Sequence, residues 1–264
     1  MVVEETVGRL RITESILEGR ELHVRFNLRQ GLVISVFEGL SIQVRYAEFL
    51  GIAGPVGCGK TTLLKVLAGL LKPERGEVYY KNQRLEKPTP AISLVLPTTT
   101  LFPWYTVLEN VMLALYSDKS LTREDKIERC RAFLDMVGLS AFDSAYPSEL
   151  SDGMKKKVIL ARALVTHPDV LLLDEPFDNI DPLAAVALRS EIENMWMNES
   201  MSPSSVVLVS HDIEELVELC DRVVVLTERP ARVKEVVEIN LQRPRDKRRR
   251  EFYDYVDKIF TLLS

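Results

Sequence analysis

A glycine-rich segment of the chain has the residue types and the spacing that bind phosphate. Residues 54–61 read Gly-Pro-Val-Gly-Cys-Gly-Lys-Thr, which matches the P-loop pattern of a glycine, any four residues and then Gly-Lys-Thr. The glycines let backbone N–H groups turn inward as an anion nest, and a helix that starts near Lys60 directs its positive end at the phosphates. Lys60 adds a charge for the β- and γ-phosphates, and the Thr61 hydroxyl can ligate Mg²⁺. The segment therefore predicts a site for a nucleoside triphosphate with Mg²⁺. The candidate nucleotide-binding residues are Gly54, Pro55, Val56, Gly57, Cys58, Gly59, Lys60, Thr61 and Thr62.

Two acidic residues end a second apolar run. Residues 170–173 are Val-Leu-Leu-Leu, and Asp174 and Glu175 follow them. A carboxylate at the tip of a buried strand beside a P-loop can hold Mg²⁺, and a second carboxylate can polarise the attacking water. Taken alone, the pair could equally be solvated acids at a strand end. The P-loop lysine 114 residues earlier (174 − 60) favours the chemical role. We therefore expect Thr61 and Asp174 to be metal ligands and Glu175 to be catalytic.

A histidine follows a third apolar run. His211 comes directly after residues 206–210, which read Val-Val-Leu-Val-Ser. A lone histidine at a strand end is more often structural. Ligands of open α/β sheets, however, bind at the carboxyl edge of the strands, where a histidine can donate a hydrogen bond to a γ-phosphate. His211 is therefore a second catalytic candidate.

A helical run that begins near residue 152 has a polar start. Leu150, Ser151, Asp152, Gly153 and Met154 precede or open it, and Ser151 is a plausible N-cap. The N-terminus of a helix suits phosphate, but an ordinary cap has the same residue types. The spacing alone leaves both interpretations open.

Composition restricts the classes of protein to consider. The chain has 264 residues, a formal net charge of −5 and three scattered cysteines, Cys58, Cys130 and Cys220. This charge argues against a general nucleic-acid binder, and the cysteines are too few for a disulfide framework or a zinc site. No apolar run of about 18 residues predicts a membrane span, and the first 20 residues do not resemble a signal peptide. We expect a protein that stays inside the cell unless a partner holds it at a membrane.

The elements that would position these residues alternate along the chain. Short alternating runs between 22 and 44 predict an antiparallel β unit, whereas 49–53, 170–173, 206–209 and 223–226 predict buried parallel strands with helices between them. The expected fold is an α/β P-loop NTPase fold with a mostly parallel core sheet, an N-terminal antiparallel β subdomain and an inserted helical subdomain.

The expected organisation is a single domain over 1–264. Its α/β core takes up about 1–97 and 168–240, the helical subdomain about 98–167, and a basic and amphipathic tail about 241–264. The tail is interpreted as a solvated charge run, Lys247 to Arg250, followed by a helix that docks on the core. Contact of the tail with anionic lipid or with a partner is the alternative.

The motifs, in this order, resemble the nucleotide-binding subunit of an ATP-binding-cassette (ABC) transporter. The P-loop is similar to the Walker A motif, and 171–175 is similar to Walker B with its adjacent glutamate. Residues 150–154 lie where the family has its signature Leu-Ser-Gly-Gly-Gln/Met, 178–181 lie at the D-loop with Asp181, and His211 lies at the switch histidine. The segment 101–111 is similar to one in nitrate, sulfonate, taurine and thiamine-precursor importers, as are 174–177, 211–215 and 243–246.

This resemblance implies a transport ATPase. Two such subunits would pack head to tail around two ATP molecules, and each ATP would contact the Walker A motif of one chain and the signature of the other. The implied cofactors are ATP and Mg²⁺. The implied partners are membrane permease subunits, a second ABC subunit and a solute-binding protein, with no nucleic acid. The implied location is the cytoplasm, peripheral at the inner face of the cell membrane. Leu101 to Trp104 would lie near the coupling helix of the permease, and core packing is the alternative role of Phe102 and Trp104.

Three departures from the family pattern bear on activity. Pro97 stands where the family has its Q-loop glutamine, seven residues before Trp104, and it offers no side chain to Mg²⁺ or water. Asp152 replaces the first signature glycine and would repel a γ-phosphate. Gly31 stands at the place of the aromatic residue that stacks on adenine. Thr98, Thr99 or Thr100 could take the place of the glutamine, and Phe26 or Phe37 that of the aromatic residue. The nearby lysines 155–157 could offset the negative charge of Asp152.

These departures leave three functions to compare. The first is an importer ATPase whose hydrolysis is slow or asymmetric. The second is a degenerate cassette that acts as a nucleotide-gated regulatory or assembly module, and the third is an ABC protein without a permease.

Overall fold

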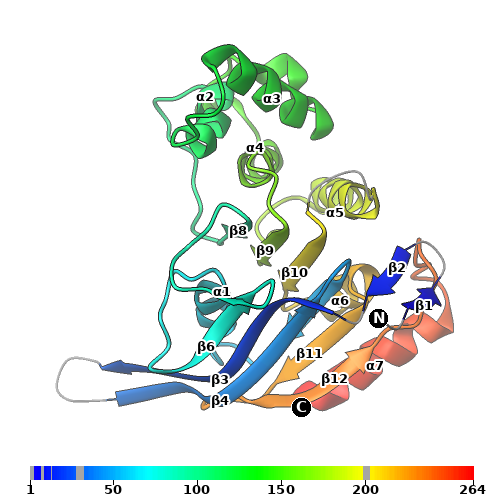
Figure 1. Ribbon diagram of the computed structural model, residues 1–264. Helices are drawn as coiled ribbons and strands as arrows, with labels where there is room; N and C mark the ends of the chain where they lie inside the picture. Colours follow the sequence, from blue (N-terminus) through cyan, green and yellow to red (C-terminus); the bar gives the residue numbers. More distant parts are fainter. Residues whose placement is uncertain (1–2, 7–8, 13, 28–32, 199–202) are drawn as a thin grey trace.

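A six-stranded sheet forms the centre of the molecule (Figure 1). The computed structural model describes residues 3–6, 9–12, 14–27, 33–198 and 203–264. The strand order is β12-β11-β5-β10-β9-β8, and all neighbours pair in parallel except β12, which is antiparallel to β11. The strands are β5 (Phe49–Ala53), β8 (Ile92–Val95), β9 (Val170–Asp174), β10 (Ser205–Val209), β11 (Arg222–Leu226) and β12 (Val233–Glu238). The apolar runs of the sequence become buried strands, as an α/β sheet covered on both faces requires.

Alternate residues of the parallel strands pack into two different cores. Leu50, Leu172 and Val207 belong to the core shared with helix α1 (Lys60–Leu67) and the antiparallel strands. Phe49 and Leu173 belong to the core shared with helices on the opposite face. Those helices are α5 (Pro182–Met197), α6 (Ile213–Leu219) and α7 (Arg250–Leu263). Because both faces are covered, only the edges and ends of the sheet can bind a ligand.

A second, antiparallel sheet shares a core with α1 and the central sheet. Its order is β4-β3-β6-β7, with β3 (Ser15–Asn27), β4 (Val33–Arg45), β6 (Arg75–Tyr80) and β7 (Gln83–Arg84). β1 (Val3–Thr6) and β2 (Arg9–Ile12) pair antiparallel in a separate two-stranded sheet. The short runs between 22 and 44 do form the predicted antiparallel unit, but residues 33–44 belong to one continuous strand, β4. Gly39, with φ +76°, lies within this strand without ending it.

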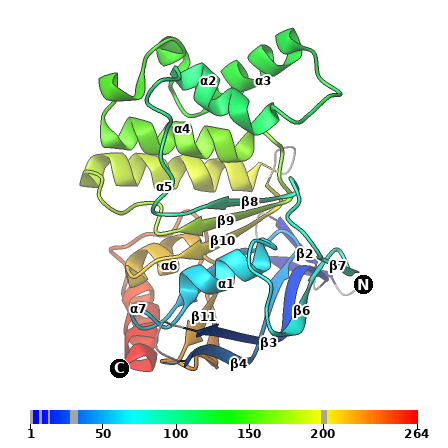
Figure 2. The same ribbon diagram turned by 90° about the vertical axis from the view of Figure 1, so that its left-hand side faces the viewer.

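A group of helices projects beyond the β8 end of the central sheet. It contains α2 (Val107–Met112), α3 (Arg123–Met136) and α4 (Asp152–Leu164), with short 3₁₀ turns at Leu113–Leu115, Ser140–Phe142 and Pro147–Glu149. Figure 2 shows α4 and α5 side by side, with α2 and α3 on one side of them and the strands on the other. Capping boxes fix the starts of α2 and α3, with Thr106 and Thr122 as N-caps. These helices lie in the segment that the sequence predicted to be helical.

The C-terminal tail docks on the core, as the first interpretation of its sequence predicted. Phe252 and Ile259 of α7 are buried, and Arg245 donates to the carbonyl oxygens of Val217 and Cys220 at 2.6 and 2.5 Å. Arg245 is itself buried, which lowers the pKa of its guanidinium to about 10. The tail therefore closes the C-terminal end of α6 through buried contacts. Among the described residues, no helix combines the length and the apolar character that a membrane span requires.

We expect Phe252→Ala to destabilise the protein by about 3–5 kcal/mol, the usual cost of deleting a buried aromatic ring. The matched control is Phe260→Ala in the same helix, because the side chain of Phe260 is 62% exposed. Urea unfolding of both variants measures the difference. Equal stability of the two variants would show that α7 does not contribute to the core.

Candidate active site

The P-loop joins the carboxyl end of β5 to the first turn of α1. Gly57 and Gly59 have φ values of +78° and +118°, which disfavour other residues. A Cβ atom on Gly59 would lie 2.4 Å from Cγ1 of Val36 and 3.0 Å from the ring of Phe37. The backbone of the loop is therefore pressed against β4, and the loop conformation depends on the antiparallel sheet as well as on its own glycines.

The lysine of the loop lies across the loop itself. Lys60 Nζ donates to the carbonyl oxygen of Gly54 at 2.7 Å and to that of Pro55 at 3.2 Å. An ammonium group has three donors, so a third remains for another acceptor. Val56, at the tip, is 96% exposed, and Cys58 is buried beneath the loop. This arrangement combines a cation and a backbone nest at one point, which is the chemistry of an anion site.

The two predicted metal ligands are in direct contact. Thr61 Oγ1 donates to Asp174 Oδ2 at 2.6 Å, although the two residues are 113 positions apart in the sequence. Asp174 is buried at the end of β9, and this burial raises the pKa of its carboxyl against the opposing effects of Thr61 and Lys60. A carboxylate and a hydroxyl oxygen are the hard ligands that Mg²⁺ prefers. The pair therefore fits Mg²⁺, which would also stabilise the charged form of the buried carboxylate.

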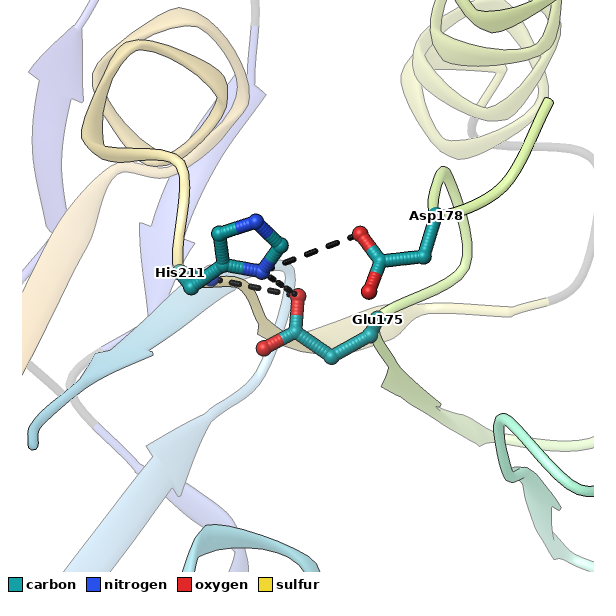
Figure 3. Close-up of side chains that lie close together, drawn as sticks. All are labelled: Glu175, Asp178 and His211. Carbon is teal, nitrogen blue, oxygen red and sulfur yellow. Dashed lines mark hydrogen bonds and ion pairs between the residues drawn. The ribbon is translucent and has the colours of Figure 1, made fainter. Parts of the chain in front are cut away.

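Glu175 and His211 face one another across the ends of β9 and β10 (Figure 3). Glu175 Oε2 lies 3.0 Å from Nδ1 of His211 and accepts from its backbone N–H at 3.1 Å. Glu175 has φ +49°, and its own N–H donates to the carbonyl oxygen of Val209 at 3.0 Å. The structure thus brings together the two residues predicted to be catalytic, and it fixes the carboxylate of Glu175 through its backbone and its side chain.

Burial and charge have opposing effects on the pKa values of Glu175 and His211. Burial raises the pKa of Glu175, despite the opposing hydrogen bonds and charge of His211. For His211, burial lowers the pKa, but the charge and hydrogen bond of Glu175, with the charges of Asp178 and Glu215, outweigh it and raise the pKa above 6.5. A raised pKa makes the carboxylate a better base and keeps the imidazole protonated to higher pH.

Asp178 also belongs to this cluster, although only Asp181 of the segment 178–181 was predicted to be a site residue. Its Oδ1 lies 3.7 Å from Nδ1 of His211, and one ligand atom each of Glu175, Asp178 and His211 lie within 4.8 Å of one another. The sequence signal for a functional role of Asp178 is its position three residues after Glu175, at the turn that leads into α5. The cluster gives His211 two acidic neighbours.

The signature-like segment lies away from the P-loop of its own chain, in the helical group (Figure 1). Ser151 caps α4 by accepting from the N–H of Met154 at 3.3 Å, while Asp152 is exposed and pairs with Lys155 Nζ at 2.9 Å. This contact lowers the pKa of Asp152. Gly153 is buried against α5, where a Cβ atom would lie 2.9 Å from that of Ala184. Leu150, which precedes them, is buried. The ammonium group of Lys155 thus offsets the negative charge of Asp152 within the same helix.

Two further sequence candidates have local structural roles. Asp181 is the N-cap of α5 and accepts from the N–H of Ala184 at 2.9 Å. Pro97 is exposed in the turn after β8, and Thr99 Oγ1 closes that turn by accepting from the N–H of Leu96 at 3.0 Å. The hydroxyl of Thr99 is therefore already engaged, and Thr98 and Thr100 are the exposed threonines of this turn.

The structure excludes one of the candidates for contact with adenine. Phe37 is fully buried against Gly59, so its ring cannot stack on a base. Phe26 is 40% exposed near the end of β3. The position of Gly31 lies outside the described residues.

Three aromatic side chains cluster on the surface after β8. Trp104 is 66% exposed and Phe102 40%, and their ring centroids are 5.5 Å apart, with Tyr105 beside both. The buried Asn110 fixes this segment by accepting from the N–H of Phe102 and donating to its carbonyl oxygen. Core packing, the alternative role of Phe102 and Trp104, is therefore wrong for Trp104. Phe102 also lines a cavity of about 410 Å³ together with Thr99, Thr100 and Arg162.

Comparisons with known proteins agree with this geometry. Residues 37–178 match a family model described as ABC transporter. The chain is 41% identical to an uncharacterised ABC transporter ATP-binding protein of Methanocaldococcus jannaschii, over 88% of this chain and 85% of that protein. It is 34% identical to an aliphatic sulfonates import ATP-binding protein of Bacillus cereus (88% and 89% covered). It is also 35% identical to a nitrate import ATP-binding protein of Synechocystis sp. (94% of both covered).

Solved structures share the fold. An ATP-binding cassette solved as a dimer in a post-hydrolysis state with ADP and Pi superposes with a TM-score of 0.74 at 25% identity, covering 84% of this chain and 98% of the other. The cbiO1 protein of Clostridium perfringens, part of the cbiONQ complex, gives the same TM-score at 24% identity, with 93% and 92% covered. The predicted fold class is confirmed.

Because Glu175 raises the pKa of His211, we expect Glu175→Gln to lower that pKa, so that the imidazole loses its proton at a lower pH. NMR titration of the histidine ring protons measures this change. His23 and His167 are internal controls, since neither ring contacts Glu175, and burial lowers the pKa of His167. An unchanged His211 titration would show that the contact with Glu175 does not form in solution.

Proposed function

The chain belongs to the ABC transporter family of ATP-binding domains, and from this premise we propose that it is the ATPase subunit of an importer, using MgATP to power solute uptake through a membrane permease. The observation that carries the proposal is the meeting of the P-loop, the Thr61–Asp174 pair and the Glu175–His211 pair at one edge of the sheet. Import is supported by the names of the sulfonate and nitrate relatives.

In the proposed mechanism the chain positions and stabilises charge, as phosphoryl transfer requires. The P-loop backbone and Lys60 bind the β- and γ-phosphates. Thr61 and Asp174 would hold Mg²⁺, which supplies neutralisation of the phosphate charge when bound. Glu175 accepts a proton from the attacking water, and its raised pKa suits this role. His211, protonated beside Glu175, keeps Nδ1 on the carboxylate and leaves Nε2–H to donate to the γ-phosphate.

The site is completed, in this proposal, by a second ABC subunit, identical or paralogous. Its Leu150–Met154 segment would approach the γ-phosphate, and Asp181 would lie at the interface between the subunits. The dimeric solved relative with ADP and Pi supports this arrangement. Lys155 offsets the charge of Asp152, so slow or asymmetric turnover would arise mainly from Pro97. A degenerate, non-hydrolysing cassette is not supported, since the sulfonate and nitrate relatives are named as import ATP-binding proteins.

The exposed aromatic cluster at 102–105 supports docking of a permease. Phe102 lines the 410 Å³ cavity, and together with the exposed Trp104 it forms an apolar surface of the kind that partner proteins bind. Docking there would hold the chain peripherally at the inner, cytoplasmic face of the membrane, with a solute-binding protein in the same system. We also propose the division of the single domain given above, with the helical subdomain at about 98–167 between the permease and the nucleotide.

We expect Glu175→Gln to lower ATP turnover by about 100-fold or more, the loss of one general base, while ATP affinity changes by only a few-fold. Phosphate release and nucleotide titration measure the two quantities. Glu214→Gln is the matched control, because this partly exposed glutamate lies in the first turn of the adjacent helix α6. Wild-type turnover in the Glu175 variant would overturn the assignment of Glu175 as the base.

We expect Lys155→Ala to slow the turnover of the dimer several-fold, because an unpaired Asp152 would then face the γ-phosphate. The double change Asp152→Asn with Lys155→Ala should restore the rate. Steady-state ATPase assays test this, with Lys156→Ala as the control for loss of a neighbouring charge. If Lys155→Ala retains the wild-type rate, the proposed approach of Asp152 to the phosphate is wrong.

A further inference from the structure

The loop between β11 and β12 lies beside the P-loop. Since β11 pairs in parallel with β5, the two strands end at the same edge of the sheet. Hydrogen bonds join the ends of this loop: the Thr227 N–H donates to the Arg232 carbonyl oxygen at 2.9 Å, and the Arg232 N–H donates to Thr227 Oγ1 at 3.0 Å. The loop is therefore a fixed turn rather than a loose connection.

The same loop is attached to the strand that supports the P-loop. Ala231 is buried, and its N–H donates to the carbonyl oxygen of Val36 at 2.8 Å, which places it beside Phe37. Val36 and Phe37 are also the residues against which Gly59 packs. One short segment of β4 therefore holds the P-loop and the β11–β12 loop in a defined relation.

Arg229 extends from this fixed turn to the P-loop. Its Nη2 atom lies 3.1 Å from the position that a Cβ atom on Gly57 would occupy, so the guanidinium rests against the backbone of the loop. Arg229 is exposed, and across the described parts of the chain no carboxylate forms an ion pair with it. An arginine held in place without a countercharge, beside an anion nest, is suited to bind an anion.

The charge distribution around the P-loop agrees with this role. Burial raises the pKa of the Cys58 thiol, while the positive charges of Lys60 and Arg229 lower it, so both cations act on the centre of the loop. The acidic groups of the site have other partners: Asp174 binds Thr61, and Glu175 binds His211. Lys60 and Arg229 therefore both bring positive charge to the P-loop.

We propose that Arg229 is a second cation of the nucleotide site, which contacts the phosphate chain of a bound nucleoside di- or triphosphate from the β11–β12 side. The inference rests on the nucleotide site proposed above. A planar guanidinium matches phosphate oxygens and is weakly hydrated, so it loses little solvation on contact. Glycine at position 57 leaves the space for this approach, since a side chain there would meet the guanidinium.

The test is the affinity of Arg229→Gln for ATP, ADP and adenosine, measured by calorimetry on the full chain. We expect ATP and ADP to bind about tenfold more weakly, the loss of one charge-assisted hydrogen bond, and adenosine to be unaffected. The matched control is Arg232→Gln, which removes the same charge from the same loop. Its side chain lines a different cavity, with His23 and Arg75, and none of the residues lining that cavity belongs to the P-loop. This control should bind all three ligands like the wild type.

Arg229→Lys provides a second variant, which keeps the charge and should bind ATP more tightly than Arg229→Gln. Thermal unfolding of each variant excludes a folding defect as the cause of lost affinity. Unchanged ATP affinity in Arg229→Gln, or an equal loss for adenosine, would overturn the phosphate contact while leaving the nucleotide site intact. Absence of ATP binding to the unaltered chain would overturn both proposals.

Discussion

Four buried strands, β9, β10, β5 and β11, pair in parallel and end together at one edge of the central sheet. Their apolar residues alternate between two cores, so a slip by one residue would move each set into the core packed for the other. The registers Leu208↔Gly51 and Leu208↔Leu173 fix where each strand ends. The P-loop, Asp174, Glu175 and the loop before α6 meet because of this pairing. The chemistry of the site therefore depends on the packing of residues that never touch a ligand.

The site has a positive side and an acidic side. Lys60 belongs to the P-loop and the Arg229 guanidinium lies against it, whereas Asp174, Glu175 and Asp178 lie at the end of β9 and in the turn that follows. Burial raises the pKa of Asp174 and Glu175, so ionisation of these carboxyls is opposed unless a cation or donor compensates. A nucleoside triphosphate with Mg²⁺ supplies negative charge to the first side and positive charge to the second, which explains why such a ligand suits both.

The helical part of the molecule has a different relation to the site. Its exposed segment around Asp152 begins α4, away from the P-loop of the same chain, and Gly153 seats that helix on α5. Because Asp181 caps α5, a movement of the helical part would also act on the turn that carries Asp178 and Glu175. In the proposed function, binding of a permease at Trp104 and of a second subunit at Asp152 would both act on this turn.

The sequence by itself determined the P-loop, the strand-end acids, His211 and the fold class, because these follow from local residue patterns and from the order of the strands. It also indicated that the tail docks on the core, because the helical spacing of apolar residues in the tail is a local pattern. Only the tertiary structure decided which side chains are buried and which distant residues meet: Phe37 lies under the P-loop, Trp104 is exposed, and Arg229 reaches Gly57, 172 positions earlier in the sequence (229 − 57). Burial and contact depend on how two sheets pack around α1, and no local pattern encodes that packing.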